Sequence, residues 1–209
     1  KRVLKSCRGE DKGSTGAVVG MDVSGKGDTG TPVDCETAKT DEGGRPVKLS
    51  CLYTNADSLV NKLTELDARN GMSKRYHVIA VTEAQSKWQR NGAQISELQM
   101  SGYYTYHNIE EGKKRRGIVV YVRDDIEATP ISSDVEFEEC IWLSLKLKDG
   151  DKLTFGCIYR SPNSTKQNNK QLITTLKEIG KINRSRLLIV GDFNFPGIDW
   201  RTEQLAIPD

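Results

Sequence analysis

Five polar residues of the sequence close or shortly follow apolar runs that have the length of a β-strand. They are Asn55, Glu83, Tyr159, Asp192 and Asn194. In open α/β sheets, functional groups collect just beyond the carboxyl ends of strands. A single polar residue in such a place is usually a loop residue or a helix cap. Several polar residues of complementary types, all at strand ends, are less easily explained as loop residues or caps. The five residues therefore form a candidate site.

The chemistry of these five side chains is complementary. Glu83 and Asn55 carry oxygen donors of the kind that Mg²⁺ prefers, with Mn²⁺ as the alternative ion, and such an ion neutralises charge on a phosphate oxygen. Asp192 can orient or deprotonate an attacking water, and Asn194 can hold that water or donate to a phosphate oxygen. The Tyr159 hydroxyl can donate to a developing oxyanion. The residue types therefore favour metal-assisted hydrolysis of a phosphate ester.

The elements expected to position these residues mix strands and helices. Apolar alternation predicts strands at 47–53, 78–81, 117–122 and 187–190, and a hairpin whose arms, 141–147 and 153–159, meet at Asp149-Gly150. Helical spacing of apolar residues predicts one helix around 59–66 and a second around 172–182. This mixture favours an α/β layered domain with mixed sheets over a helical bundle.

The first 46 residues differ in character from the rest of the chain. All fourteen aromatic residues lie after residue 46, whereas nine of the nineteen glycines lie before it. Such a segment buries too little apolar surface to offset an ordering entropy of ~1–2 kcal/mol per residue. We therefore expect a disordered Gly-rich tail or linker over 1–46 and one domain over 47–209. The near-match to a phosphate-binding loop at 20–27 ends in Gly27 instead of Ser or Thr, which favours a linker.

Composition limits the classes of protein that remain. No apolar run approaches the ~20 residues that span a bilayer, so we expect no membrane partner. The formal net charge is only +2, so contact with nucleic acid has to come from a local patch. The five cysteines show no C-x-x-C spacing and their odd number suits no disulfide framework, which favours a reducing, intracellular compartment.

Four short motifs resemble those of the endonuclease/exonuclease/phosphatase superfamily. Gly191-Asp192-Phe193-Asn194 resembles its G-D-F/L/W-N motif, and Thr82-Glu83 resembles the T-E motif that carries a metal-binding glutamate. Asn55-Ala56-Asp57-Ser58-Leu59 resembles its early N-A/V-x-S-L motif, and Tyr159-Arg160-Ser161-Pro162 its Y-R-x-P motif. Order and approximate spacing agree from about Val47 to the last residue. Four motifs in order are much more specific than one.

Two further segments, 117–122 and 195–200, resemble the endonuclease domain of LINE-type non-LTR retrotransposons. That resemblance implies a DNase I-like sandwich of two mixed sheets flanked by helices. It also implies a magnesium-dependent endonuclease that hydrolyses DNA phosphodiester bonds and nicks target DNA for insertion. The expected partners are DNA and, in the full protein, a fused reverse transcriptase, with action in the nucleus.

The resemblance also implies a role for each of the five residues. It places Glu83 with Asn55 on the metal side of the site. It places Asp192 and Asn194 around the water and the phosphate, and Tyr159 near the oxyanion of the transition state. These roles agree with those that the residue types suggest.

The closing Ser/Thr-Asp-His motif of this superfamily has no counterpart in the 209 residues. The two histidines, His77 and His107, do not stand in such a motif. We therefore expect a domain truncated at its C-terminus, with its final strands missing. Such a chain should cleave DNA poorly by itself.

Three residues are expected to contact nucleic acid. Arg160 stands beside Tyr159, Arg116 ends the basic run 113–116, and Trp88 lies among polar and basic residues. Arginines can neutralise phosphates, and an exposed tryptophan can stack on a base. The alternatives are a salt bridge for Arg160 and a solvated loop tip for the basic run.

Two other functions remain open at this point. One is a repair-type abasic endonuclease or a phosphatase of the same superfamily, because the G-D-F-N motif serves all of these. The other is a non-catalytic remnant that binds nucleic acid or protein. Cleavage of intact, abasic and small phosphorylated substrates would separate them.

Overall fold

The computed structural model describes residues 17–21, 32–40, 46–72, 75–86, 94–109, 115–132, 137–147, 152–182, 186–194, 198–199 and 204–205. The strands are β1 (Ala17–Met21), β2 (Pro32–Thr40), β3 (Pro46–Asn55), β4 (Val78–Thr82), β5 (Tyr103–His107), β6 (Ile118–Arg123), β7 (Ala128–Pro130), β8 (Cys140–Lys146), β9 (Lys152–Tyr159), β10 (Arg186–Asp192), β11 (Ile198–Asp199) and β12 (Gln204–Leu205). The helices are α1 (Leu63–Met72), the short 3-10 helix η1 (Ile95–Leu98) and α2 (Lys166–Ile182).

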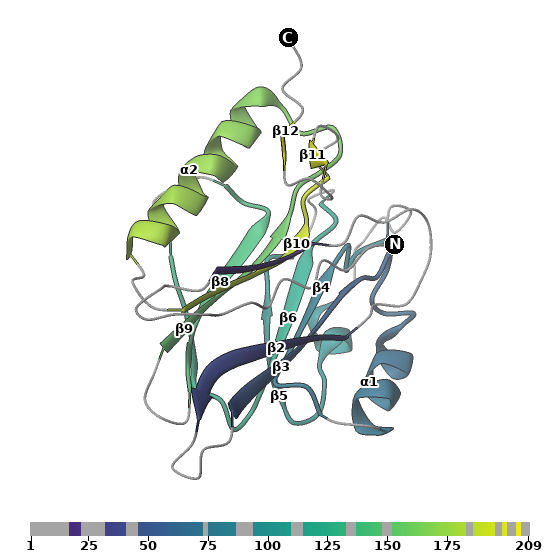
Figure 1. Cartoon of the computed structure of the whole chain (residues 1–209). Helices are drawn as coiled ribbons and strands as arrows, with labels where there is room; N and C mark the ends of the chain where they lie inside the picture. Colours follow the sequence, from purple (N-terminus) through teal and green to yellow (C-terminus); the bar gives the residue numbers. More distant parts are fainter. Residues whose placement is uncertain are drawn as a thin grey trace.

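Ten of these strands form two mixed sheets (Figure 1). Sheet A has the strand order β1-β10-β9-β8-β7, and sheet B has the order β2-β3-β4-β6-β5. In sheet A, β10 runs parallel to both β1 and β9. In sheet B, β3 and β4 run parallel to each other. The remaining neighbours within both sheets are antiparallel. The expected sandwich of two mixed sheets with flanking helices is confirmed.

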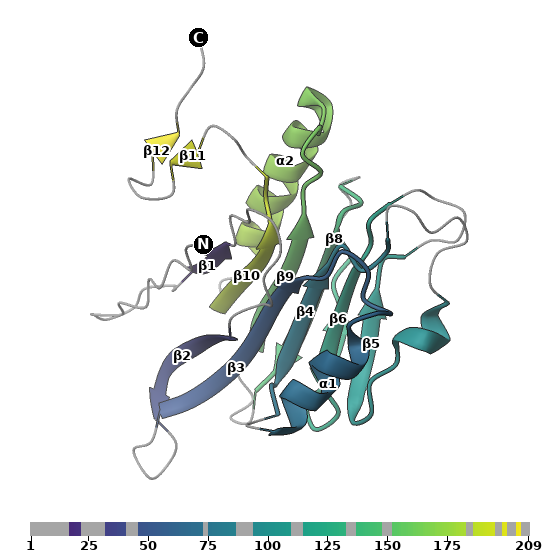
Figure 2. The same ribbon diagram turned by 90° about the vertical axis from the view of Figure 1, so that its right-hand side faces the viewer.

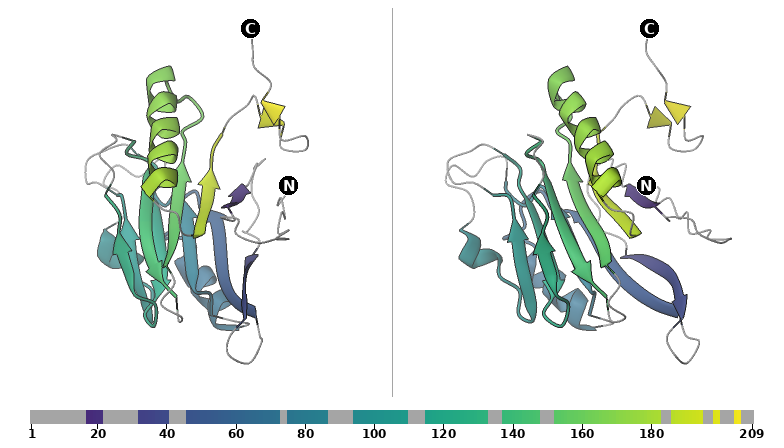
Figure 3. Two further views of the ribbon diagram at one scale, coloured as in Figure 1. Left: turned by 60° about the vertical axis from the view of Figure 1, so that its left-hand side comes forward. Right: turned by 90° about the vertical axis from the view of Figure 1, so that its left-hand side faces the viewer.

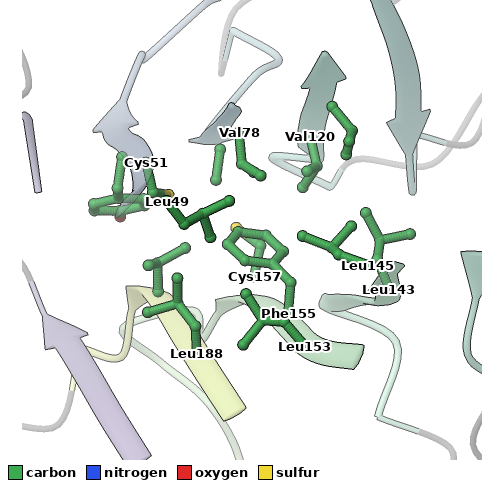
Figure 4. Close-up of a cluster of buried hydrophobic side chains, with 14 of the residues drawn as sticks. Leu49, Cys51, Val78, Val120, Leu143, Leu145, Leu153, Phe155, Cys157 and Leu188 are labelled. Atoms are coloured by element: carbon green, nitrogen blue, oxygen red, sulfur yellow. The ribbon is translucent and has the colours of Figure 1, made fainter. Parts of the chain in front are cut away.

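The main core lies between the inner faces of the two sheets. On β9, alternate residues from Leu153 to Tyr159 enter this core, and on β3 alternate residues from Leu49 to Tyr53 do so. Side chains of a strand alternate between its two faces, which explains this pattern. Figure 4 shows Cys51 and Val78 of sheet B facing Phe155 and Cys157 of sheet A.

Helices cover the two outer faces. Leu66 of α1 and Leu98 of η1 pack with buried residues of sheet B, on the side seen in Figure 2. Leu172 and Ile179 of α2 pack with buried residues of sheet A, on the side seen in the right panel of Figure 3. Thr165 caps α2, because its hydroxyl accepts a hydrogen bond from the Asn168 N–H at 3.1 Å. No helix among the described residues is both long and apolar enough to cross a membrane.

The helix expected around residue 59 begins later in the structure, at Leu63. The N–H groups of Ser58 and Leu59 donate to the carbonyls of Glu83 and Ala84, at 3.0 and 2.8 Å. Those bonds hold the chain in a turn alongside the loop that follows β4. Leu59 is buried, but it belongs to this turn instead of the helix.

The expectation of disorder over residues 1–46 differs from the structure at two segments. Strand β1 pairs in parallel with β10, and β2 pairs antiparallel with β3. An edge strand is held by backbone hydrogen bonds, which require no apolar side chains. Most of the phosphate-loop-like stretch, 22–27, lies outside the described residues.

Gly156 on β9 lies directly opposite Trp142 on β8. A Cβ atom at this position would lie 2.1 Å from Cζ3 of the Trp142 ring. We expect Gly156→Ala to lower the free energy of unfolding by about 1–3 kcal/mol because the rigid ring has to move. Gly180→Ala in α2 is the control, since no atom lies within 4 Å of its added Cβ. It should raise stability by about 0.5–1 kcal/mol. Urea denaturation measures both, and equal losses would contradict this packing.

Candidate active site

Two pairs of parallel strands bring four of the predicted site residues to one edge of the sandwich. In sheet B, Asn55 at the end of β3 pairs with Thr82 at the end of β4, and Glu83 follows one residue later. In sheet A, Tyr159 at the end of β9 pairs with Asp192 at the end of β10. All four therefore lie at or just after the carboxyl ends of strands, as the sequence predicted, and the strands of each pair run parallel.

Two side-chain hydrogen bonds at this edge cross from one sheet to the other. The Tyr159 hydroxyl donates to Glu83 Oε1 at 3.0 Å. The Asn55 Nδ2 donates to Asp192 Oδ2 at 3.4 Å. Each bond joins one residue of a sheet B strand end to one of a sheet A strand end. The structure thus gathers these four side chains into one cluster.

Asn194 belongs to the same cluster through the turn that follows β10. Its backbone N–H donates to Asp192 Oδ1 at 3.2 Å, and its Nδ2 donates to the Arg160 carbonyl at 2.9 Å. Its φ of 43° lies in the left-handed region, which asparagine tolerates better than most residues. Asn194 therefore acts directly on Asp192 through its backbone.

Strained backbone is concentrated in the loops of the site. Within the described residues, the non-glycine residues with positive φ are Asp57, Ser58, Glu83 and Asn194. Such conformations cost about 1–3 kcal/mol each and persist where the surroundings enforce them. For Asp57, Ser58 and Glu83, backbone hydrogen bonds between the loops after β3 and β4 enforce the positive φ. These loops place Asp57 beside Glu83.

Arg160 is buried in the structure, with only 4% of its surface exposed. Its Nε donates to Asn169 Oδ1 at 2.8 Å, and its Nη1 donates to the Asn194 carbonyl. Its backbone N–H donates to the Asp192 carbonyl at 2.8 Å. The guanidinium therefore ties the turn after β10 to the first turns of α2. This inward position differs from the DNA-facing position that the sequence suggested.

Arg116 also lies in the cluster, just before β6. Its Nη2 donates to Glu83 Oε2 and to Asp57 Oδ1, and only 13% of its side chain is exposed. The basic run was expected at a solvated loop or on DNA, so this ion pair with Glu83 was not foreseen. Asp57 was also missed, although its place two residues after Asn55 in the N-A-D-S-L motif was a usable signal. Trp88 lies outside the described residues.

Burial changes the acid–base properties of two site residues. It raises the pKa of Asp192 to about 6, with bonds from Asn194 and Asn55 opposing the shift and the Glu83 charge adding to it. Burial and the Glu83 charge also raise the pKa of Tyr159. Tyr159 is therefore a protonated donor at neutral pH, whereas Asp192 exchanges its proton close to neutrality. A carboxylate of this kind suits a general base.

The two histidines stand apart from this cluster in their contacts. His77 precedes β4, whereas Glu83 follows it, so the two lie at opposite ends of that strand. The His77 Nδ1 accepts from the Ser50 N–H at 3.0 Å and lies 2.7 Å from the Ser50 hydroxyl. His107 is exposed at the end of β5.

A family model decides how this cluster is classified. The model of the endonuclease/exonuclease/phosphatase family matches residues 48–209. The chain belongs to the endonuclease/exonuclease/phosphatase family. The match covers the five predicted site residues and both sheets from β3 onward. Membership places the protein among nucleases and phosphatases, which are generally metal-dependent hydrolases.

Three solved structures are similar to parts of this chain. The endonuclease domain of TRAS1, a telomere-specific non-LTR retrotransposon, is 12% identical with a TM-score of 0.48, over 69% of this chain and 58% of that one. ANGEL2, a 2′,3′-cyclic phosphatase, is 19% identical with a TM-score of 0.45, over 66% of this chain and 43% of that one. A family protein from Bacteroides thetaiotaomicron is 13% identical with a TM-score of 0.47, over 79% and 65%. The chain thus spans less than two thirds of each protein. No curated protein matches it.

The contacts of Arg160 predict a structural cost when it is replaced. We expect Arg160→Met to lower the free energy of unfolding by about 2–4 kcal/mol, because Asn169 and the Asn194 carbonyl lose their donor. Arg115→Met, which removes a more exposed pair with Glu138, should cost at most about 1 kcal/mol. Urea denaturation compares the two. A different outcome would indicate a direct phosphate contact. Arg160→Met would then be stable, and the slope of log K for DNA binding against log salt concentration would become smaller by about one.

The raised pKa of Asp192 predicts a pH-dependent gain of stability in Asp192→Asn. The unfolded chain releases this proton more readily than the folded chain does, so ionisation of Asp192 destabilises the fold as pH rises from about 4 to above about 6. At about pH 7.5 the variant should be about 1–3 kcal/mol more stable, and at about pH 4 the gain should vanish. Urea denaturation at both pH values measures it, and a gain that does not change with pH would refute the assignment.

Proposed function

We propose that this chain carries a divalent-metal-dependent site that hydrolyses phosphodiester bonds of DNA. The observation that supports the proposal is the pair of hydrogen bonds between the sheets, from Tyr159 to Glu83 and from Asn55 to Asp192. These bonds bring together a metal-binding carboxylate, an acid whose pKa lies near neutrality, a phenol donor and a carboxamide. Metal-assisted hydrolysis of a phosphate ester can use each of these groups.

A divalent cation fits the donors at Glu83. The carboxylate already pairs with a positive group, the Arg116 guanidinium, and this pairing supports a cation at the same position. Mg²⁺ is usually held by one or two carboxylates, with water and substrate phosphates as its other ligands. In the part of the chain that is described, no group of three or more His, Cys, Asp or Glu residues converges, so any ion here would rely on water and substrate for its other ligands. Glu83 and Asn55 would hold the ion, Mg²⁺ or Mn²⁺, which would neutralise charge on the phosphate.

The other side chains act on the water and on the phosphate in this proposal. Asp192 orients the attacking water and accepts its proton, because its pKa lies near neutrality. The Asn194 N–H holds the Asp192 carboxylate in place, and the carboxamide oxygen of Asn194 is left to hold the water. The Tyr159 hydroxyl donates a hydrogen bond to a phosphate oxygen as negative charge develops on that oxygen.

We further propose that the substrate is target DNA nicked for insertion of a non-LTR retrotransposon, in the nucleus, with a fused reverse transcriptase as partner. This finer proposal rests on the sequence of segments 117–122 and 195–200 and on Tyr159-Arg160. Trp88 remains the candidate for stacking on a base, and Arg116 lies where an anionic phosphate would be attracted. A repair nuclease or a phosphatase would use the same cluster on a different substrate.

Nicking of supercoiled plasmid in the presence of Mg²⁺ tests the proposal. We expect slow nicking by the 209-residue chain, because its residues include no Ser-Asp-His motif. Glu83→Gln should lower the rate to the level seen without metal, and Asp192→Asn should lower it by about 10²-fold. Glu138→Gln, which changes an acid paired with Arg115, is the control and should not affect the rate.

The outcomes separate the alternatives. Nicking that Glu83→Gln leaves unchanged would count against this site. Faster cleavage of abasic DNA or of small phosphorylated substrates than of intact DNA would favour a repair nuclease or a phosphatase. Binding of DNA with no metal-dependent cleavage of any of these substrates would favour a non-catalytic remnant.

A further inference from the structure

The Glu83 carboxylate is paired with a cation that belongs to the chain itself. Nη2 of Arg116 donates to Glu83 Oε2 and to Asp57 Oδ1, while Glu83 Oε1 accepts from Tyr159. The side chains of Arg116 and Glu83 are 13% and 14% exposed. Charges shielded from water in this way interact more strongly than charges on an open surface. Arg116 is therefore a substantial part of the electrostatic environment of Glu83.

Backbone bonds hold Arg116 beside Glu83. The Arg116 carbonyl accepts from the Gln85 N–H at 2.8 Å, and the Gly117 carbonyl accepts from the Ala84 N–H at 3.2 Å. Gly117 has a φ of 68°, and an added Cβ would lie 2.7 Å from Ile109 Cγ1, so this close approach requires glycine. None of these bonds uses the Arg116 side chain. Replacing that side chain should therefore leave the local backbone in place.

The pairing leaves the Arg116 guanidinium incompletely satisfied. Its Nε and Nη1 are buried and have no hydrogen-bond partner. Buried donors without acceptors make an arrangement less stable than a fully paired one. Arg116 can therefore leave Glu83 more easily than a fully bonded arginine could.

We propose that Arg116 is an exchangeable counter-ion that sets the cation affinity of the Glu83 site. This inference rests on the proposed function, in which Glu83 holds a divalent ion. The guanidinium and the metal compete for the same carboxylate, so metal binding has to release Arg116 from Glu83. The released guanidinium carries a planar set of donors that matches phosphate oxygens. The phosphodiester of the substrate is the anion that it would then bind.

Mn²⁺ binding to the 209-residue chain, followed by electron paramagnetic resonance of the free ion and without substrate, tests this exchange. Arg116→Gln should lower the Kd at least about tenfold, because the competing charge is removed. Arg116→Lys should stay close to the wild-type value, because it keeps a positive charge on the same backbone. Arg115→Gln removes the same charge one residue away, where the arginine pairs with Glu138. This matched control should change the Kd by less than about twofold. Glu83→Gln should remove the site in each background.

Thermal unfolding gives a second readout that shows whether each variant is folded. Without metal, Arg116→Gln should have a lower Tm than the wild type, because Glu83 and Asp57 lose their counter-ion. Saturating Mn²⁺ should raise the Tm of this variant by more than it raises that of the wild type, because a ligand that binds more tightly stabilises the fold more. An unfolded variant would show neither a transition nor a metal-dependent shift. In that case Arg116→Met, which also removes the charge, replaces Arg116→Gln, and the same gain in Mn²⁺ affinity is expected.

Each outcome has a distinct meaning. Equal or weaker Mn²⁺ binding by folded Arg116→Gln, with Glu83-dependent binding in the wild type, would overturn the exchange and leave the metal site intact. A loss of affinity in Arg116→Lys with no gain in Arg116→Gln would overturn it as well. Absence of Glu83-dependent binding in every protein would overturn the metal site of the proposed function, and the exchange with it.

Discussion

The apolar contact between the inner faces of the two sheets is the interaction on which the rest of the structure depends. Tyr53 and Tyr159 are the last inward-facing residues of β3 and β9 in that core, and each continues directly into the site. The Tyr159 hydroxyl donates to Glu83. The Tyr53 hydroxyl lies 2.9 Å from the hydroxyl of Thr82, the residue before Glu83. A slip of one residue in either strand would turn these side chains to the opposite face. Packing of the core therefore also aligns the site.

The site concentrates charge and strain that the fold has to compensate elsewhere. Asp192 and Glu83 are both shielded from water, and each raises the energy of the other when ionised. Arg116 offsets part of this cost, and Arg160 holds the turn in which Asn194 has a positive φ. The surrounding strands supply the stability, because their inward-facing side chains are almost fully buried. Function at this edge is thus supported by packing in the middle of the sandwich.

The sequence predicted six of the twelve described strands, β3, β4, β6, β8, β9 and β10, because their alternating or continuous apolar runs reflect burial. It did not predict β5, where Tyr103 is buried and Tyr104 is 56% exposed, because an aromatic-rich edge strand lacks clear alternation. It placed the five site residues at strand ends, and the structure brings them together. It did not predict the inward positions of Arg116 and Arg160, whose bonds to Glu83 and to the Asn194 carbonyl join residues more than thirty positions apart. Such contacts exist only after folding, so no local pattern records them.

The burial of Arg160 has an evolutionary consequence. The Arg160 guanidinium, just after β9, contacts both Asn169 in helix α2 and Asn194 in the turn after β10. A lineage that replaced the arginine would leave the other two with unmatched acceptors, and compensating changes would have to follow in distant segments. The acceptor at Asn194 is a backbone carbonyl, which any residue supplies, so the side chains are coupled at positions 160 and 169. Related sequences should therefore vary at these two positions together. Through Arg160, the turn that carries Asn194 depends on a residue of helix α2, although that helix contributes no group to the chemistry.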